Sequence, residues 1–149
     1  LFGATNCCGG EGRYFMAKHH DGLIYTMVLV SAADSHMTDA ELLTIGEMVR
    51  VLPVFNGYDE TTLPATTEAC AELLAEEDGL DRVIDFVKGA VGDKLAETAY
   101  ALACDVVAAD GEANQEELRL LEIIRHRLDI DRLIAAGIER GSRARHMTG

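Results

Sequence analysis

Two stretches of the chain carry the same pattern: VSAADSHMTDAELLTIGEMVRVL at residues 30–52 and VVAADGEANQEELRLLEIIRHRL at residues 106–128. They align without a gap. The identical positions are a Val, an Ala-Ala-Asp triplet, a Glu-Leu pair and a final Leu, and most remaining apolar positions match in kind. In each copy an apolar helix ends near the Asp, a short polar loop follows, and a second helix begins near the Glu. The pattern predicts a helix–loop–helix unit that is used twice.

Two such units usually pack about a pseudo-twofold axis, so that their equivalent loops approach each other within the bundle. This arrangement would bring four acids together, namely Asp34, Glu41, Asp110 and Glu117. Carboxylate oxygens, with backbone carbonyls and water, are ligands that suit a hard ion such as Ca²⁺, Mg²⁺ or Mn²⁺. The four acids are therefore candidate ligands of a divalent cation. His36 in the first loop is a further candidate ligand, although a single loop histidine more often faces solvent.

A second interpretation of the same acids needs no metal. Glu41 follows Thr38, and Glu117 follows Asn114, at the spacing of a capping box, which alone explains both glutamates. The aspartates follow the carboxyl ends of helices, where the helix dipole disfavours an exposed negative charge by about 0.3–1 kcal/mol. Either a turn, as at Asp110-Gly111, or a bound cation would offset that cost. Both interpretations stay open at this point.

Apolar residues recur at helical spacing from Asp21 onward, and no comparable run alternates between apolar and polar residues. We predict an all-α, single-domain bundle of seven helices near residues 21–33, 38–52, 62–76, 80–91, 94–109, 114–128 and 130–140. Several breakers separate these segments: Pro53, Asn56-Gly57, Asp78-Gly79 and Gly92-Asp93, while Pro64 suits a first helical turn.

The two ends of the chain differ from the middle. Residues 1–15 are Gly-rich and without periodicity, and we interpret them as a disordered extension or a segment foreign to the natural protein, with Met16 as a plausible natural start. The helical domain is expected over residues 16–140. Residues 141–149 are expected to form a flexible, basic tail, with a partner-binding tail as the alternative.

The charge balance limits the ligands. Twenty-six acidic and thirteen basic residues leave a net charge of −13, which disfavours nucleic acid and favours cations or basic protein partners, with a homodimer as a further expectation. The longest apolar stretch, Leu23 to Ala33, is too short for a membrane span and predicts a buried helix. The cysteines have no zinc-site spacing, and Cys70 and Cys104 are expected in the core of a protein from a reducing compartment, the cytoplasm.

The doubled Ala-Ala-Asp, polar loop and first-turn Glu resemble the TerB-like family of tellurite-resistance proteins. The resemblance covers roughly Asp21 to Glu139, and the second copy, AADGEANQEEL, is the more typical. The first copy departs from the pattern with Ser35 in place of Gly111 and with His36 in the loop. The resemblance implies an all-helical bundle, a role in tellurite or general stress response, and a divalent-cation site at the paired acids.

No catalytic triad, phosphate-binding loop or paired Glu-x-x-His motif occurs in the sequence, so we do not expect an enzyme. The leading hypothesis is a non-enzymatic cation-binding module of a stress-response assembly. The alternative is a metal-free protein-interaction scaffold in which the four acids cap helices and form corners. A metalloenzyme with an open coordination position is the third hypothesis.

Overall fold

The computed structural model describes the backbone of residues 7–34, 37–109 and 111–149, and the side chains of residues 18–33, 37–109 and 111–149. Its elements are α1 (Cys7–Ser31), η1 (Ala32–Asp34), α2 (Asp39–Val51), η2 (Pro53–Phe55), η3 (Glu60–Thr62), α3 (Leu63–Leu74), α4 (Gly79–Ala109), α5 (Gln115–Arg127) and α6 (Arg132–Arg145), where η marks a short 3₁₀ helix. These residues contain no strand. The predicted all-α bundle is confirmed.

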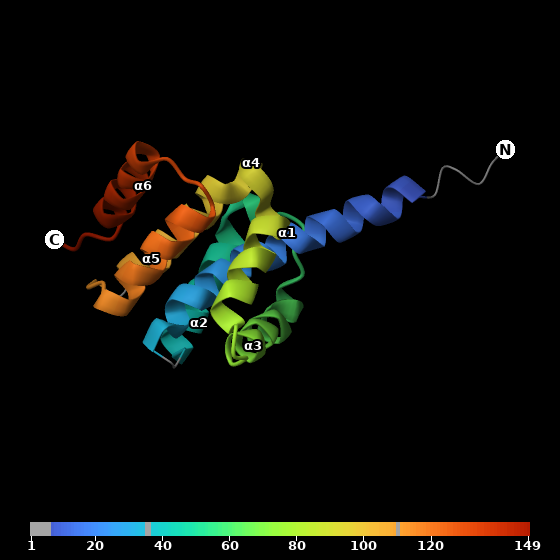
Figure 1. The fold of residues 1–149 in the computed structure, drawn as a ribbon, viewed down its shortest axis with the longest axis horizontal. Coiled ribbons are helices and arrows are strands. Elements are labelled where there is room, and N and C mark those ends of the chain that lie inside the picture. The colour runs from blue at the N-terminus through green and yellow to red at the C-terminus, as the bar shows by residue number, and fades with distance from the viewer. Residues whose placement is uncertain (1–6, 35–36, 110) are drawn as a thin grey trace.

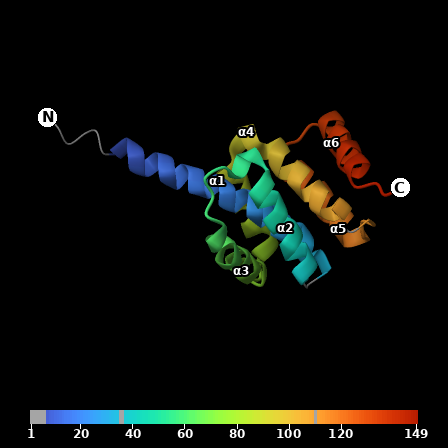
Figure 2. The ribbon, with the colours of Figure 1, turned by 180° about the vertical axis from the view of Figure 1, so that it is seen from behind.

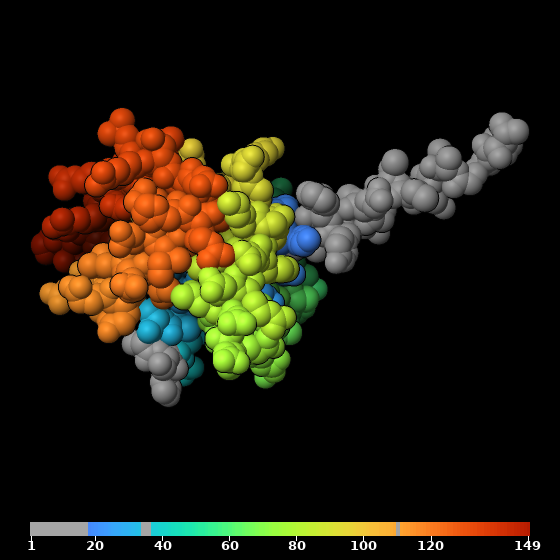
Figure 3. Space-filling view, viewed as in Figure 1, coloured from blue at the N-terminus to red at the C-terminus, as the bar shows by residue number. Residues whose placement is uncertain are grey.

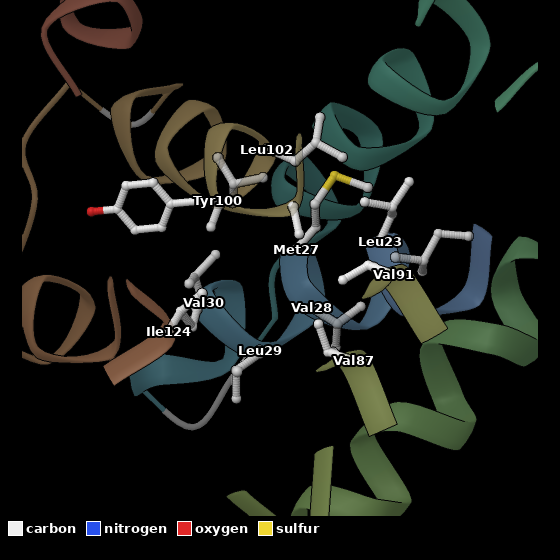
Figure 4. Packing of buried hydrophobic residues seen from close by; sticks show 14 of the residues in the cluster. Leu23, Met27, Val28, Leu29, Val30, Val87, Val91, Tyr100, Leu102 and Ile124 are labelled. Carbon is white, nitrogen blue, oxygen red and sulfur yellow. The ribbon is translucent and has the colours of Figure 1, made fainter. Parts of the chain in front are cut away.

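The centre of the fold is the packing of α4 against α1. The second half of α1 lies among the other helices, whereas its first half projects away from them (Figures 1 and 2). Leu23, Met27 and Val28 of α1 are fully buried and lie in one cluster with residues of α4 such as Val87 (Figure 4). At Gly22 the two helices come so close that an added Cβ would lie 2.7 Å from the Cβ of Ala90. The buried helix that the apolar stretch predicts is therefore confirmed.

The first helix is longer than the sequence suggested. It begins at Cys7, whereas we expected its start near residue 21. Residues 7–20 contain no proline, so no residue removes a backbone donor and the hydrogen-bonded ladder that is stabilised by the buried half can continue.

The number of helices also differs from the prediction, with six α-helices in the described residues. The two helices expected at residues 80–91 and 94–109 are joined in α4. The expected break is present as a kink, because Gly92 has φ 59° and ψ −170°, a conformation that residues with a Cβ rarely adopt. Helix continues on both sides of this residue.

The last helix, α6, runs to Arg145, five residues past its expected end at 140. Ser142 is 1% exposed, and its hydroxyl donates a hydrogen bond to Asp105 Oδ1 at 2.7 Å. Arg145 Nη2 donates to the same oxygen at 2.6 Å. These contacts hold the end of α6 on α4, and they explain why residues 141–145 are helical although their composition is typical of a tail.

The expected breakers act where the sequence placed them. α2 ends at Val51 and Pro53 opens η2, while Gly57 has a positive φ of 83°. The segment after α2 contacts α1, because Nε2 of His20 lies within hydrogen-bond distance, 3.0 Å, of the carbonyl oxygen of Val54. Burial, together with the neighbouring His19, lowers the pKa of His20.

Cys70 and Cys104 are buried, as predicted, and burial raises the pKa of each thiol to about 12. Such thiols stay protonated and are poor nucleophiles. Among the described residues, no helix combines the length and apolarity that a bilayer crossing requires.

Candidate functional site

The first repeat loop leads into α2 through a complete capping box. Thr38 is the N-cap residue, and its Oγ1 accepts a hydrogen bond from the Glu41 amide at 3.3 Å. In return, Glu41 Oε2 accepts from the Thr38 amide at 2.6 Å and from the Thr38 hydroxyl at 2.9 Å. Glu41 is partly exposed. The capping role predicted for this residue is confirmed.

The second loop leads into α5 in the same way. Asn114 is the N-cap residue, and its Oδ1 accepts from the Glu117 amide at 2.8 Å. Glu117 Oε2 accepts from the Asn114 amide at 2.9 Å. Glu117, however, is only 6% exposed, which is unusual for a charged residue in a first helical turn. The capping prediction is confirmed here too, in a far more enclosed environment.

The structure describes the two aspartates of the predicted site to different extents. Asp110, Ser35 and His36 lie outside the described residues, and Asp34 is described by its backbone alone. That backbone ends η1, which contacts α5, the helix that carries Glu117. The first turns of α2 and α5 also lie at the same end of the bundle in both views (Figures 1 and 2). That the four acids form one site therefore stays a prediction.

Within the side chains of residues 18–33, 37–109 and 111–149, no three His, Cys, Asp or Glu side chains form a group that could hold a metal ion. One other polar group lies next to the first loop. The hydroxyl of Ser31, at the end of α1, is buried and has no hydrogen-bond partner in the described part of the chain. An unpaired buried hydroxyl costs about 1–3 kcal/mol.

Comparisons of the chain with protein-family models, with curated proteins and with solved structures give no match. The resemblance to the TerB-like family therefore remains a prediction that rests on the residues of the two loops.

Sequence reasoning missed a second feature, an open groove of about 870 Å³ between α5 and α6. Both helices contact α4, which supplies buried residues to the groove, including Tyr100 and Cys104. The Tyr100 hydroxyl donates a hydrogen bond to Glu139 Oε1 at 2.6 Å, and it points away from the aliphatic cluster (Figure 4). Burial and this glutamate raise the pKa of Tyr100. The sequence contains one signal for this groove, namely the helical spacing of Arg132, Arg140 and Arg143, which places them near one face of a helix.

Proposed function

We propose that this chain is a non-enzymatic, TerB-like domain of tellurite or general stress response, and that its two repeat loops hold a divalent cation. The proposed ligands are Asp34, Glu41, Asp110 and Glu117, and the ion is Ca²⁺, Mg²⁺ or Mn²⁺. The observation that carries the proposal is the pair of matching capping boxes that follow the two loops, each formed by the glutamate at the aligned position of the sequence.

Two further observations support a ligand near these loops. The short helix η1, which ends at Asp34, contacts α5. The end of the first Ala-Ala-Asp triplet therefore lies beside the helix that carries Glu117. The buried hydroxyl of Ser31 lies three residues before Asp34 in sequence and lacks a partner in the described residues. A hydrated cation supplies both positive charge and water molecules that bridge such groups.

The capping geometry equally supports a second function, a metal-free interaction scaffold. Each glutamate already uses one carboxylate oxygen to cap its own helix, and that role alone accounts for its position. In this case the acids set the angle between helices, and the protein acts through its surface.

Thermal unfolding separates the two functions. We would remove bound metal ions from the protein with a chelator and then add Ca²⁺, Mg²⁺ or Mn²⁺. The same titration would be made on the unsubstituted chain and on the Asp34→Asn, Asp110→Asn double variant. An ion at one hundred times its Kd stabilises the fold by about 2.7 kcal/mol, which corresponds to roughly 5–10 °C in a domain of this size. The proposal expects one ion to give such a shift and the double variant to lose it.

A matched control removes two negative charges elsewhere, through Glu68→Gln on α3 and Asp93→Asn on α4, both of which are exposed. This control variant is expected to keep the ion response. If millimolar concentrations of every ion leave the melting temperature of the natural sequence unchanged, the cation site is wrong and the scaffold function replaces it.

A further inference from the structure

The groove between α5 and α6 has the charge opposite to that of the rest of the molecule. Residues 115–149 contain seven of the thirteen basic residues and only six of the twenty-six acidic ones. Figure 3 shows α5 and α6 side by side on one face of the molecule, away from α3. A ligand at this face therefore meets a local environment that differs strongly from the net charge of −13.

Four arginines line this groove: Arg125 from α5, and Arg132, Arg140 and Arg143 from α6. None of them forms an ion pair with a carboxylate among the described side chains, whereas Arg50, Arg82, Lys88, Arg127 and Arg145 all do. The groove also contains two carboxylates, Glu122 and Glu139, of which Glu139 is bonded to Tyr100. Its lining is thus net positive. Arg125 Nη2 lies 2.9 Å from His126 Nε2, and arginine favours a bidentate geometry when it binds a carboxylate.

The groove also offers apolar surface. Tyr100, Val107 and Leu121 are buried at its floor, while Leu118 and Met147 are 48% and 68% exposed where they line it. Exposed apolar side chains beside arginines that form no ion pair among the described side chains fit an amphipathic ligand better than a simple anion. Because the groove is open along α6, whose fourteen residues span about 21 Å, it suits an elongated ligand.

We propose that this groove binds an acidic amphipathic helix of a partner protein. The apolar face of that helix packs on Leu118, Leu121 and Met147, and its carboxylates pair with Arg125, Arg140 and Arg143. The partner helix fills the space between α5 and α6 as a further member of the bundle, in the helix-in-groove mode of recognition. This interaction requires no cation. Gly111 and Ala113 of the second repeat loop line the same groove.

The test uses the full chain in a chelating buffer and a fluorescent fourteen-residue peptide, with leucines at i, i+3, i+4 and i+7 spacing and glutamates elsewhere. We expect saturable binding by fluorescence anisotropy, and an affinity that falls as salt is added. A second peptide with lysine in place of every glutamate is expected to bind at least about tenfold more weakly, since unlike charges set the specificity.

The Arg140→Glu, Arg143→Glu variant is expected to lower the affinity for the acidic peptide by at least about tenfold. Both residues are exposed and form no ion pair in the described residues, so the variant should keep its fold, which circular dichroism would check. A control variant, Arg50→Glu with Lys94→Glu, makes the same change in net charge on α2 and α4. This control is expected to bind the peptide within about threefold of the natural sequence, because remote exposed charges are screened.

Three outcomes would overturn the proposal. The first is no binding at millimolar peptide, or an equal loss of affinity in both variants. The second is displacement of the peptide by dodecanoate at a lower concentration than by unlabelled peptide, which would assign the groove to an acyl anion. The third is a dimer in sedimentation that Arg140→Glu, Arg143→Glu dissociates, which would assign the groove to a second copy of the chain.

Discussion

Ile45 in the first helix–loop–helix unit and Leu121 in the second occupy equivalent positions of the repeat, and both are buried. The glutamates four residues earlier behave differently, because Glu41 is partly exposed whereas Glu117 is 6% exposed. Each glutamate nevertheless makes the same capping box. The comparison teaches that a short sequence pattern specifies how a helix begins, whereas the neighbouring helices decide how much of that first turn is exposed to water.

The largest expected effect concerns the two equivalent core residues. Ile45→Ala and Leu121→Ala should each lower the free energy of unfolding by about 2–5 kcal/mol, because each removes buried methyl groups and leaves a cavity. Ile45 is 0% exposed, whereas Leu121 is 8% exposed and lines the open groove, so water reaches the second cavity more easily. Urea denaturation should therefore show the greater loss for Ile45→Ala. A greater loss for Leu121→Ala would mean that the second unit is the better packed of the two.

An intermediate effect is expected for the paired glutamates. In a chelating buffer, Glu117→Ala should lower the free energy of unfolding by about 1.5–3 kcal/mol, which is the range for hydrogen bonds to charged groups. The loss is expected to be large because water cannot easily replace a carboxylate in an enclosed position. Glu41→Ala should cost about 0.5–1.5 kcal/mol, since water can replace its partly exposed carboxylate. Denaturation of both variants side by side measures the difference. Equal costs would show that capping alone determines the contribution of both residues.

The smallest effect is expected at the ends of the two second helices, where Val51 and Arg127 are equivalent. Val51 is 77% exposed, whereas Arg127 donates to Asp81 and Asp85 at 2.6 Å in each case. Arg127→Ala should cost about 0.5–1 kcal/mol at low salt, and this cost should shrink in high salt because these groups are accessible to ions. Val51→Ala should change stability by less than about 0.5 kcal/mol. A salt-independent loss in Arg127→Ala would indicate that the stem of this side chain, and not its charge, provides the stabilisation.

Much of the fold could be predicted from the sequence, because its signals are local. The periodic apolar residues, the capping pairs at Thr38 and Asn114, and the breakers Pro53 and Gly57 act within one or two turns of helix. One error occurred where a distant contact was decisive. α6 extends past residue 140 because Ser142 and Arg145 reach Asp105, which lies 37 and 40 residues earlier in the chain.

The candidate site was predicted from the same local signals, and the structure describes the side chains of its two glutamates. The capping role of Glu41 and Glu117 follows from spacing and is confirmed. The joint role of Asp34 and Asp110 depends on how two distant loops meet, and these side chains lie outside the described residues. The arginine groove was missed because Arg125 and Arg140 face a common space only once α5 and α6 are both placed on α4.

The sequence by itself determined the all-helical class, the starts of α2 and α5, and the capping boxes at those starts, since hydrogen bonds between residues three or four positions apart specify all of these. Only the tertiary structure decided that Glu117 is enclosed, that α6 continues to Arg145, and that four arginines surround one groove. These features depend on which side chains meet across helices, and burial and charge environment are properties of that packing and not of any single segment.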